Sequence, residues 1–396
     1  MISKTWLFLV LVPLFIFGCA GRDIHPDLHA DAKVLVRQWT YQTANLYQRE
    51  SGNRGTEYSN ALMVDNTLVF GSRGGGLTAL YPIMEQVRWK FPVVDGVISE
   101  IYFHDGSLYF GGHDGNLYSV NFENGQINWK YSLRNPMVSR PTVFQGRLFV
   151  TTSDDTTYAL DAGSGEWIWH YRRRSETAAT IHGACTPIIF NNQVITAYSD
   201  GYMVALSLED GKVKWEKRLN QGRKFIDIDA KPVLHNGMIY IPAYDGALYA
   251  IKPENGEIVW CFDVGGIKSV DIDDEKIFLP SSDGNVYAIQ LNDAKLLWKF
   301  ELDGGVLTQL VVTEKEIFFG STFQYLYGLD KNTGAGIYRF DSGNGSGFAS
   351  SPAYDRKTNR FYLMSTSGNL YSFFVRQPRT KELKYIVSDP YVFFEE

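Results

Sequence analysis

Seven histidines, three cysteines and a short glycine run are the features of this sequence that could support catalysis or metal binding. The histidines are His25, His29, His104, His113, His170, His182 and His235. None has the His-Glu-x-x-His spacing that places two imidazoles on one metal ion, and no Gly-x-Ser-x-Gly nucleophile turn occurs. The run Gly74-Gly75-Gly76 lacks the Lys and the Ser or Thr of a phosphate-binding loop, so we interpret it as a hairpin turn. We therefore expect no catalytic site, no metal site and no cofactor.

Cys19 lies in a context that predicts covalent modification. Lys4 and an apolar run precede it, which is the layout of a secretory signal peptide. An uncleaved membrane anchor is the alternative, but the run is shorter than the ~20 residues that span a bilayer. The stretch from Ile16 to Cys19 resembles a bacterial lipobox, and Ala20 rather than Asp after the Cys implies the outer membrane. We expect residues 1–18 to be removed and Cys19 to carry a lipid anchor on the periplasmic face of that membrane.

Cys185 and Cys261 are then the remaining candidates for a disulfide in an oxidising compartment. The repeat described below places Cys185 at an innermost strand and Cys261 on an outermost strand of another blade. A disulfide needs Cα atoms within about 7 Å. We expect the two cysteines to be unpaired, as small buried apolar side chains.

The charge of the chain limits the class of partner. The formal net charge is -6, and removal of residues 1–18 takes away only Lys4, which makes the mature chain more acidic. Nucleic acids and anionic lipid surfaces select for an excess of Lys and Arg. We expect no nucleic-acid partner.

Tryptophans recur at one register along the chain. They are Trp39, Trp89, Trp129, Trp169, Trp215, Trp260 and Trp298, and Tyr338 takes the next place, at intervals of 38 to 50 residues. Repeats of about 40 to 45 residues with strand and turn signals are typical of a propeller whose blades are four-stranded sheets. Eight such positions predict an all-β, eight-bladed β-propeller of antiparallel blades. A Trp at one register in every blade is usually a packing block between sheets, so we expect a structural role rather than ligand stacking.

Residues 239 to 260 show the repeating unit most plainly. We expect strands at Ile239–Ala243, Ala247–Ile251 and Glu257–Trp260, separated by turns at Asp245-Gly246 and Asn255-Gly256, because these dipeptides tolerate the positive φ of tight hairpins. Equivalent first turns stand at Asp114-Gly115, Asp200-Gly201, Asp283-Gly284 and Ser367-Gly368.

The two ends of the repeat predict how the ring closes. The last unit has inner strands at Phe361–Ser365 and Leu370–Val375 but no following Trp, whereas Trp39 precedes any inner strand. We expect the segment from Val36 to Tyr41 to supply the outer strand of the last blade, which removes an open sheet edge. The alternative is a closing strand from Leu383 to Val387 in the C-terminal tail.

Three connections between blades depart from the repeat. They are Arg172-Arg173-Arg174 with the residues up to Thr186, the stretch from Gln221 to Lys231, and the Gly- and Ser-rich stretch from Asp341 to Ser351. Loops on a rigid scaffold often carry binding function, whereas a charge run alone is most often a solvated face. These connections are the candidate sites of the chain.

The repeat itself resembles that of the pyrroloquinoline quinone (PQQ) dehydrogenase propellers. Its best copy runs from Tyr158-Ala159-Leu160-Asp161 through Gly165 to Trp169. The dehydrogenases carry two adjacent Cys residues and a calcium ion at the quinone, and this chain has no adjacent Cys pair. The resemblance therefore implies the fold, and a periplasmic quinone- or sugar-binding protein is the alternative function.

More specific matches resemble the BamB family, the lipoprotein propellers of the outer-membrane β-barrel assembly machine. They are Ser139-Arg140-Pro141, His182-Gly183-Ala184-Cys185-Thr186-Pro187, Asp227-Ile228-Asp229-Ala230-Lys231-Pro232 and Ser346-Gly347-Phe348, which precede the third, fourth, fifth and last blades.

The family resemblance implies a function and a site. In that family the loops before the fourth and fifth blades bind the periplasmic POTRA domains of BamA, the barrel-inserting subunit of the Bam complex. The acidic residues of the second loop match Asp227 and Asp229, and an apolar residue of the first loop matches Ile181. His182 stands where the family has Arg, and one of Arg172 to Arg174 is a candidate to compensate. A scaffold of this kind is expected to align unfolded outer-membrane protein strands at an exposed blade edge.

These expectations divide the chain into four parts. Residues 1–18 are a signal peptide and residues 19–35 a lipidated linker. Residues 36–376 form the propeller, and residues 377–396 are a C-terminal tail.

Overall fold

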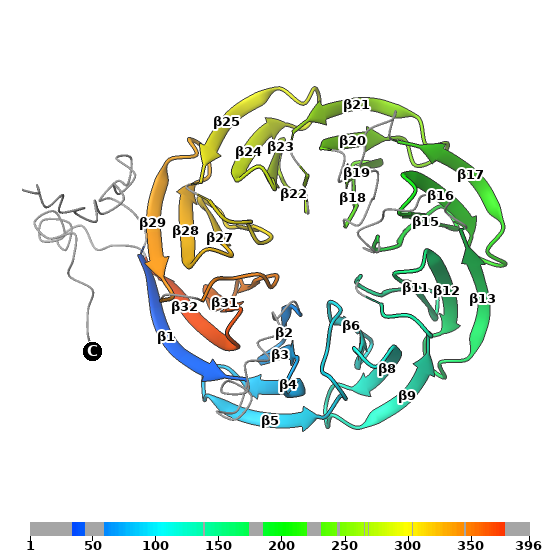
Figure 1. Cartoon of the computed structure of the whole chain (residues 1–396), viewed down its shortest axis with the longest axis horizontal. Helices are drawn as coiled ribbons and strands as arrows, with labels where there is room; N and C mark the ends of the chain where they lie inside the picture. Colours follow the sequence, from blue (N-terminus) through cyan, green and yellow to red (C-terminus); the bar gives the residue numbers. More distant parts are fainter. Residues whose placement is uncertain are drawn as a thin grey trace, which may run out of the picture.

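Eight four-stranded antiparallel sheets are arranged as blades around a central axis (Figure 1). The computed structural model describes residues 34–43, 59–137, 139–173, 185–219, 231–243, 246–264, 266–267, 269–302, 304–343 and 346–376. The predicted all-β, eight-bladed propeller is confirmed. No helix in these ranges is long and apolar enough to cross a membrane.

The two inner strands of each blade lie nearest the axis. The innermost strands, from blade 1 to blade 8, are β2 (Ala61–Val64), β6 (Tyr102–His104), β10 (Thr142–Phe144), β14 (Ile188–Phe190), β18 (Val233–His235), β22 (Asp271–Asp273), β26 (Val311–Val312) and β30 (Ala353–Asp355). The second strands are β3 (Thr67–Ser72), β7 (Ser107–Gly111), β11 (Arg147–Thr151), β15 (Gln193–Ala197), β19 (Met238–Ala243), β23 (Lys276–Pro280), β27 (Glu316–Gly320) and β31 (Arg360–Met364).

The two outer strands complete each blade. The third strands are β4 (Gly76–Tyr81), β8 (Asn116–Asn121), β12 (Thr156–Asp161), β16 (Tyr202–Ser207), β20 (Ala247–Ile251), β24 (Asn285–Gln290), β28 (Tyr325–Asp330) and β32 (Asn369–Arg376). The outermost strands are β5 (Gln86–Phe91), β9 (Ile127–Ser132), β13 (Trp167–Arg172), β17 (Val213–Arg218), β21 (Ile258–Asp263), β25 (Leu296–Glu301), β29 (Gly336–Asp341) and, in blade 8, β1 (Val34–Gln42).

The hydrophobic core is a ring of clusters, each shared by two neighbouring blades. Leu77 of blade 1 packs in one cluster with Phe110 of blade 2, and Phe70 of blade 1 packs in another with Tyr362 of blade 8. The second and third strands are almost wholly buried because both faces of each sheet contact a neighbour. The outermost strands are mostly exposed, as β17 shows. Apolar side chains of the second and third strands therefore hold neighbouring blades together.

The N-terminal strand closes the ring. β1 pairs with β32 antiparallel, from Val34 opposite Arg376 to Gln42 opposite Asn369. The predicted closure is confirmed, and the alternative strand from the C-terminal tail is wrong because β1 occupies its place. Residues 377–396 lie outside the described part of the chain.

The recurring aromatic residues join each blade to the next. The indole N–H or phenol O–H donates to a backbone carbonyl of the following blade at 2.8 to 3.2 Å: Trp39 to Pro82, Trp89 to Phe122, Trp129 to Ala162, Trp169 to Leu208, Trp215 to Pro253, Trp298 to Lys331 and Tyr338 to Leu35. The predicted structural role of this register is confirmed. Tyr338 takes its partner from β1, so the closing strand also serves as the acceptor for blade 7.

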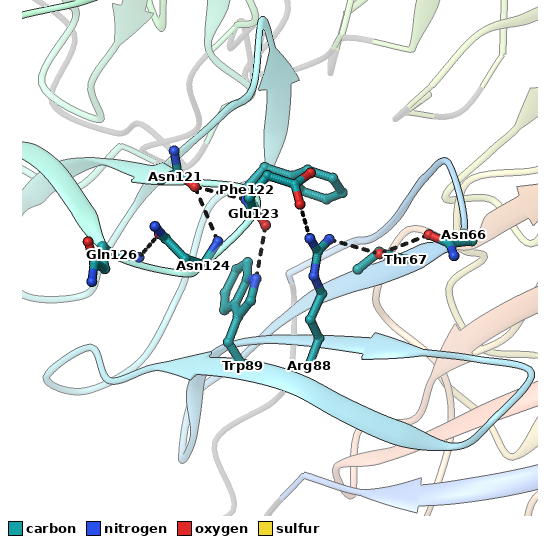
Figure 2. A network of polar contacts seen from close by, with 9 residues as sticks. All are labelled: Asn66, Thr67, Arg88, Trp89, Asn121, Phe122, Glu123, Asn124 and Gln126. Atoms are coloured by element: carbon teal, nitrogen blue, oxygen red, sulfur yellow. Dashed lines mark hydrogen bonds and ion pairs between the residues drawn. The ribbon is translucent and has the colours of Figure 1, made fainter.

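Figure 2 shows one of these junctions, between blades 1 and 2. Trp89 donates to the carbonyl of Phe122, and the neighbouring Arg88 forms an ion pair with Glu123. Arg88 also donates to Thr67 at 3.3 Å, which ties the turn of blade 2 to two strands of blade 1.

Turn glycines have the conformation that the dipeptides predict. Gly115, Gly201, Gly246, Gly284 and Gly368 have φ between 75° and 97°. Residues 73–75 form the predicted turn between β3 and β4.

The outermost strands continue past the aromatic residue, so the prediction that the strand ends at Trp260 is wrong. β21 runs on to Asp263, and Phe262 packs edge-on against Tyr287 of the next blade at 6.0 Å between ring centroids. A one-residue bulge precedes Trp260 in the pairing with β20. The bulge determines which of the following side chains face inward and which face solvent.

Candidate functional site

The five residues that sequence reasoning placed at sites lie outside the described residues. They are Cys19, Ile181, His182, Asp227 and Asp229. The structure does describe the residues at which the two candidate connections leave and re-enter the ring. Each connection joins the outermost strand of one blade to the innermost strand of the next.

The residues that precede both connections contact one turn of blade 4. This turn, around Asp200 and Gly201, joins β15 to β16. Leu219, the last described residue before connection 220–230, donates its backbone N–H to the carbonyl of Gly201 at 3.0 Å. Arg173, the last described residue before connection 174–184, donates its Nε to a carboxylate oxygen of Asp200. One turn of blade 4 thus contacts the residues that precede both connections.

Arg173 is held on several sides. Its Nη1 lies 2.9 Å from Glu216 of β17, and its guanidinium stands 4.0 Å from the ring centre of Tyr202. Its side chain is only 14% exposed. These contacts engage the Nε and Nη1 of Arg173 with blade 4.

The neighbouring arginine is more open. The side chain of Arg172 is 62% exposed and lies 3.4 Å from Asp154. Arg174 falls outside the described residues. Of the predicted Arg triplet, Arg172 is therefore the described member that is open to a partner.

The first connection re-enters the ring through buried residues. Cys185 is fully buried, and Thr186 accepts the backbone N–H of Arg140 at 3.3 Å. Thr142 of β10 donates to the carbonyl of Pro187 at 2.6 Å. The end of this connection is thus fixed to blade 3.

The second connection re-enters at Lys231, which lies 3.8 Å from Glu100 of blade 2. Sequence reasoning missed Glu100. Its position in the repeat could have indicated it, because Glu100 and Lys231 both stand two residues before an innermost strand.

The third irregular stretch, from Asp341 to Ser351, is tied down locally in its described residues. Ser342 donates to the carbonyl of Ser346 at 2.6 Å, and Gly347 donates its N–H to Thr366 at 3.1 Å. Phe348 is fully buried. This stretch packs between blades 7 and 8, which is a structural role.

The cysteines follow the sequence prediction only in part. Both Cys185 and Cys261 are free, as predicted, and Cys185 is buried. Cys261 is exposed, so its predicted burial is wrong. The physical reason is its place on β21, where it follows the inward-facing Trp260 and points to solvent.

The described histidines and acids form no metal-binding group of three or more candidate ligands. The ring of His104 stacks on Tyr102 at 6.2 Å.

Burial, followed by the charge of Arg73, lowers the pKa of His113. Burial raises the pKa of Asp155, whose carboxylate accepts the backbone N–H of Ser199 at 3.0 Å and so joins blade 3 to blade 4.

Comparison with known proteins decides the family. A family model described as outer membrane protein assembly factor BamB matches residues 86–294 and 283–381. The chain belongs to the BamB family. The resemblance drawn from the loop motifs is thereby confirmed.

Individual relatives of the BamB family are distant. The outer membrane protein assembly factor BamB of Yersinia pestis is 25% identical over 214 residues, which are 50% of this chain and 51% of that protein. The BamB of Alkalilimnicola ehrlichii is 25% identical over 104 residues, 25% of this chain and 27% of its own. The chain thus spans about half or less of the curated relatives that it matches.

Solved structures share the fold of this BamB-family chain. The crystal structure of BamB from Moraxella catarrhalis is similar with a TM-score of 0.73 at 20% identity, covering 86% of this chain and 100% of that one. Quinohemoprotein alcohol dehydrogenase from Comamonas testosteroni is similar with a TM-score of 0.68 at 15% identity, covering 89% and 78%. At these identities the likeness concerns the fold alone.

Proposed function

We propose that this protein is a non-enzymatic scaffold lipoprotein of the outer-membrane β-barrel assembly machinery, which docks the periplasmic POTRA domains of BamA. The observation that carries the proposal is the match of the BamB family model to most of the propeller. The ends of the two connections support it, because Arg173 and Leu219, which precede them, both contact the Asp200-Gly201 turn.

The proposed contacts are Asp227 and Asp229 in the second connection and Ile181 and His182 in the first. In an extended segment, residues two apart point to the same side, so the two carboxylates can act together on an Arg or Lys of the partner. The propeller should not depend on these charges, because each blade is held by its own sheet and its neighbours.

A capture experiment with purified POTRA domains tests this assignment. Asp227→Ala combined with Asp229→Ala should weaken capture by roughly tenfold or more, since loss of one side of a buried charged pair costs about 2 to 5 kcal/mol. The matched control is Glu254→Ala with Glu275→Ala, which removes two exposed acids from turns on the opposite face. Equal capture by the docking variant and the wild type would refute the site.

The lipid anchor is a separate part of the proposal. We propose that Cys19 is lipidated and holds the mature protein at the periplasmic face of the outer membrane. Cys19→Ser should release the protein from membranes or trap its precursor. A variant that still fractionates as a mature outer-membrane protein would refute the anchor.

Unfolded outer-membrane protein strands are proposed as a second class of partner, at the edge of blade 5. The residue after the recurring aromatic faces outward on each outermost strand, and in blades 1, 2, 4, 6 and 7 it is Lys90, Lys130, Glu216, Lys299 or Arg339. Charges at this place protect a strand edge from pairing. In blades 3 and 8 the place is taken by His170 and Thr40, and in β21 by Cys261, which lies near the exposed Val259 and leaves the edge of blade 5 without a central charge.

A quinone- or sugar-binding protein is the alternative, favoured by the fold shared with the quinohemoprotein dehydrogenase. The described residues fit this role poorly, because Glu100 of blade 2 reaches residues of blades 5, 7 and 8 across the centre of the ring. Measurement of binding to PQQ with calcium separates the two functions. Stoichiometric PQQ binding would favour the alternative.

A further inference from the structure

One carboxylate bridges four blades at the centre of the ring. Glu100 of blade 2 accepts a hydrogen bond from Nε2 of Gln309 in blade 7 at 3.0 Å and one from Oγ of Ser351 in blade 8 at 3.4 Å. Its second oxygen lies 3.8 Å from the Nζ of Lys231 in blade 5. Each of these residues stands two positions before the innermost strand of its blade, so the repeat itself directs their side chains toward one another.

The pair formed by Glu100 and Lys231 is partly withdrawn from water. Their side chains are 18% and 35% exposed. A charge pair with this exposure is screened less than a surface pair. The hydrogen bonds from Gln309 and Ser351 fix the orientation of the carboxylate, so little side-chain freedom remains to be lost when Lys231 approaches.

A second carboxylate acts on the same ammonium group. Asp271 of β22 is near enough to Lys231 to interact electrostatically with it, and its Oδ2 is buried with no hydrogen-bond partner among the described residues. Lys231 thus interacts with two carboxylates, those of Glu100 and Asp271. Removal of Lys231 would leave two partly buried acids uncompensated.

Lys231 lies directly after the candidate docking connection. Lys231 is the residue at which the chain leaves connection 220–230, and Pro232 and β18 follow at once. We propose that Glu100 is a positioning residue for partner docking, because it holds Lys231 and so fixes the end of connection 220–230 at the centre of the ring. Its effect on docking rests on the proposed function, whereas its effect on the connection does not.

The first experiment measures the connection without any partner. Amide hydrogen exchange is followed in the full mature protein for peptides covering residues 219–233, with those covering 174–186 as an internal reference. Glu100→Gln keeps the shape and an acceptor for Gln309 and Ser351 but removes the charge that holds Lys231. Exchange in 219–233 should rise about fivefold, as expected when a modest charge pair no longer opposes local opening, and exchange in 174–186 should not change.

Two further variants separate positioning from general bracing of the ring. Ser351→Ala removes one hydrogen bond to the same carboxylate but leaves the charge pair, and it should leave exchange in 219–233 unchanged. Lys231→Arg keeps the charge and should behave as the wild type, whereas Lys231→Met, which also removes the cation near Asp271, should raise exchange at least as much as Glu100→Gln. Unchanged exchange in Glu100→Gln, or an equal rise in Ser351→Ala, would overturn the proposal.

The second experiment measures binding to the POTRA domains of BamA. Glu100→Gln should weaken binding about fivefold with a melting temperature close to that of the wild type, and Lys231→Arg should bind normally. Wild-type affinity in a Glu100→Gln variant whose exchange has risen would overturn the docking consequence. If the wild type does not bind POTRA domains, the proposed function fails, and the exchange experiment still decides whether Glu100 holds the connection.

Discussion

Arg173 of blade 3 donates a hydrogen bond to Asp200 in the turn between β15 and β16 of blade 4, and this contact crosses the boundary between the two blades. Both side chains are less than 15% exposed. The adjacent Gly201 accepts the backbone N–H of Leu219, which returns from the outermost strand of blade 4. The residues that precede connections 174–184 and 220–230 thus both contact this turn.

Replacement of Arg173 should destabilise the propeller. Arg173→Met leaves Asp200 and Glu216 without their cation, which should lower the free energy of unfolding by about 2 to 4 kcal/mol. Arg173→Lys should recover part of this loss. Arg172→Met is the matched control, because the neighbouring side chain is largely exposed, and it should change stability by less than about 0.5 kcal/mol. Denaturant unfolding measures all three, and equal effects at both positions would contradict the buried role of Arg173.

Two tryptophans of β13 and β17 test the role of the aromatic register. Trp215→Ala removes the indole that donates to Pro253 and packs in the cluster between blades 4 and 5, so it should cost about 3 kcal/mol. Trp167 lies two residues before the register position of blade 3 and is 52% exposed. Trp167→Ala should therefore cost less than about 1 kcal/mol. Thermal unfolding of both variants checks the difference, and a fully stable Trp215→Ala would revive a ligand role for the register.

The sequence predicts the ring because the signals for it are local. Asp-Gly turns and alternating strands recur within each repeat, and Trp39 without a preceding inner strand indicates the N-terminal closure that β1 provides. The family is also accessible, since the loop motifs that precede blades 3, 4, 5 and 8 are short and contiguous.

The contacts at the centre of the ring depend on closure and are not local. Glu100 and Gln309 are 209 positions apart, and although both stand two positions before an innermost strand, that shared register does not indicate which blades face one another across the ring. The exposure of Cys261 depends on a bulge before Trp260, which shifts the alternation of inward-facing and outward-facing side chains along the strand. The roles of Arg173 and Lys231 were missed for the same reason, because their acidic partners belong to other blades.

A turn that faces the recurring aromatic ring explains why glycine occupies one position of the repeat. Gly165 has φ of 74°, and a Cβ there would lie 2.5 Å from the ring of Trp129. Ala294 occupies the equivalent turn of blade 6 with φ of 58°. Gly165→Ala should therefore destabilise the protein by about 2 kcal/mol, whereas Ala294→Gly should stabilise it by about 0.5 to 1 kcal/mol. Denaturant midpoints measure both, and effects of the same sign would contradict the equivalence of the two turns.

Asp271 makes the stability of the ring depend on pH. Burial raises the pKa of its carboxyl group from 3.8 to about 7, although Lys231 and the backbone N–H of Leu310 act to lower it. The folded state therefore binds a proton more tightly than the unfolded state, so the contribution of this group is full below pH ~4 and falls by up to about 4 kcal/mol as the pH rises through 7. Asp271→Asn keeps an acceptor for Leu310 and carries no charge, so it should be more stable than the wild type at pH 8 and lose most of this advantage at about pH 5. Urea unfolding at both pH values measures the difference, with the exposed Asp274→Asn as control, and an advantage independent of pH would show that Asp271 does not titrate in this range.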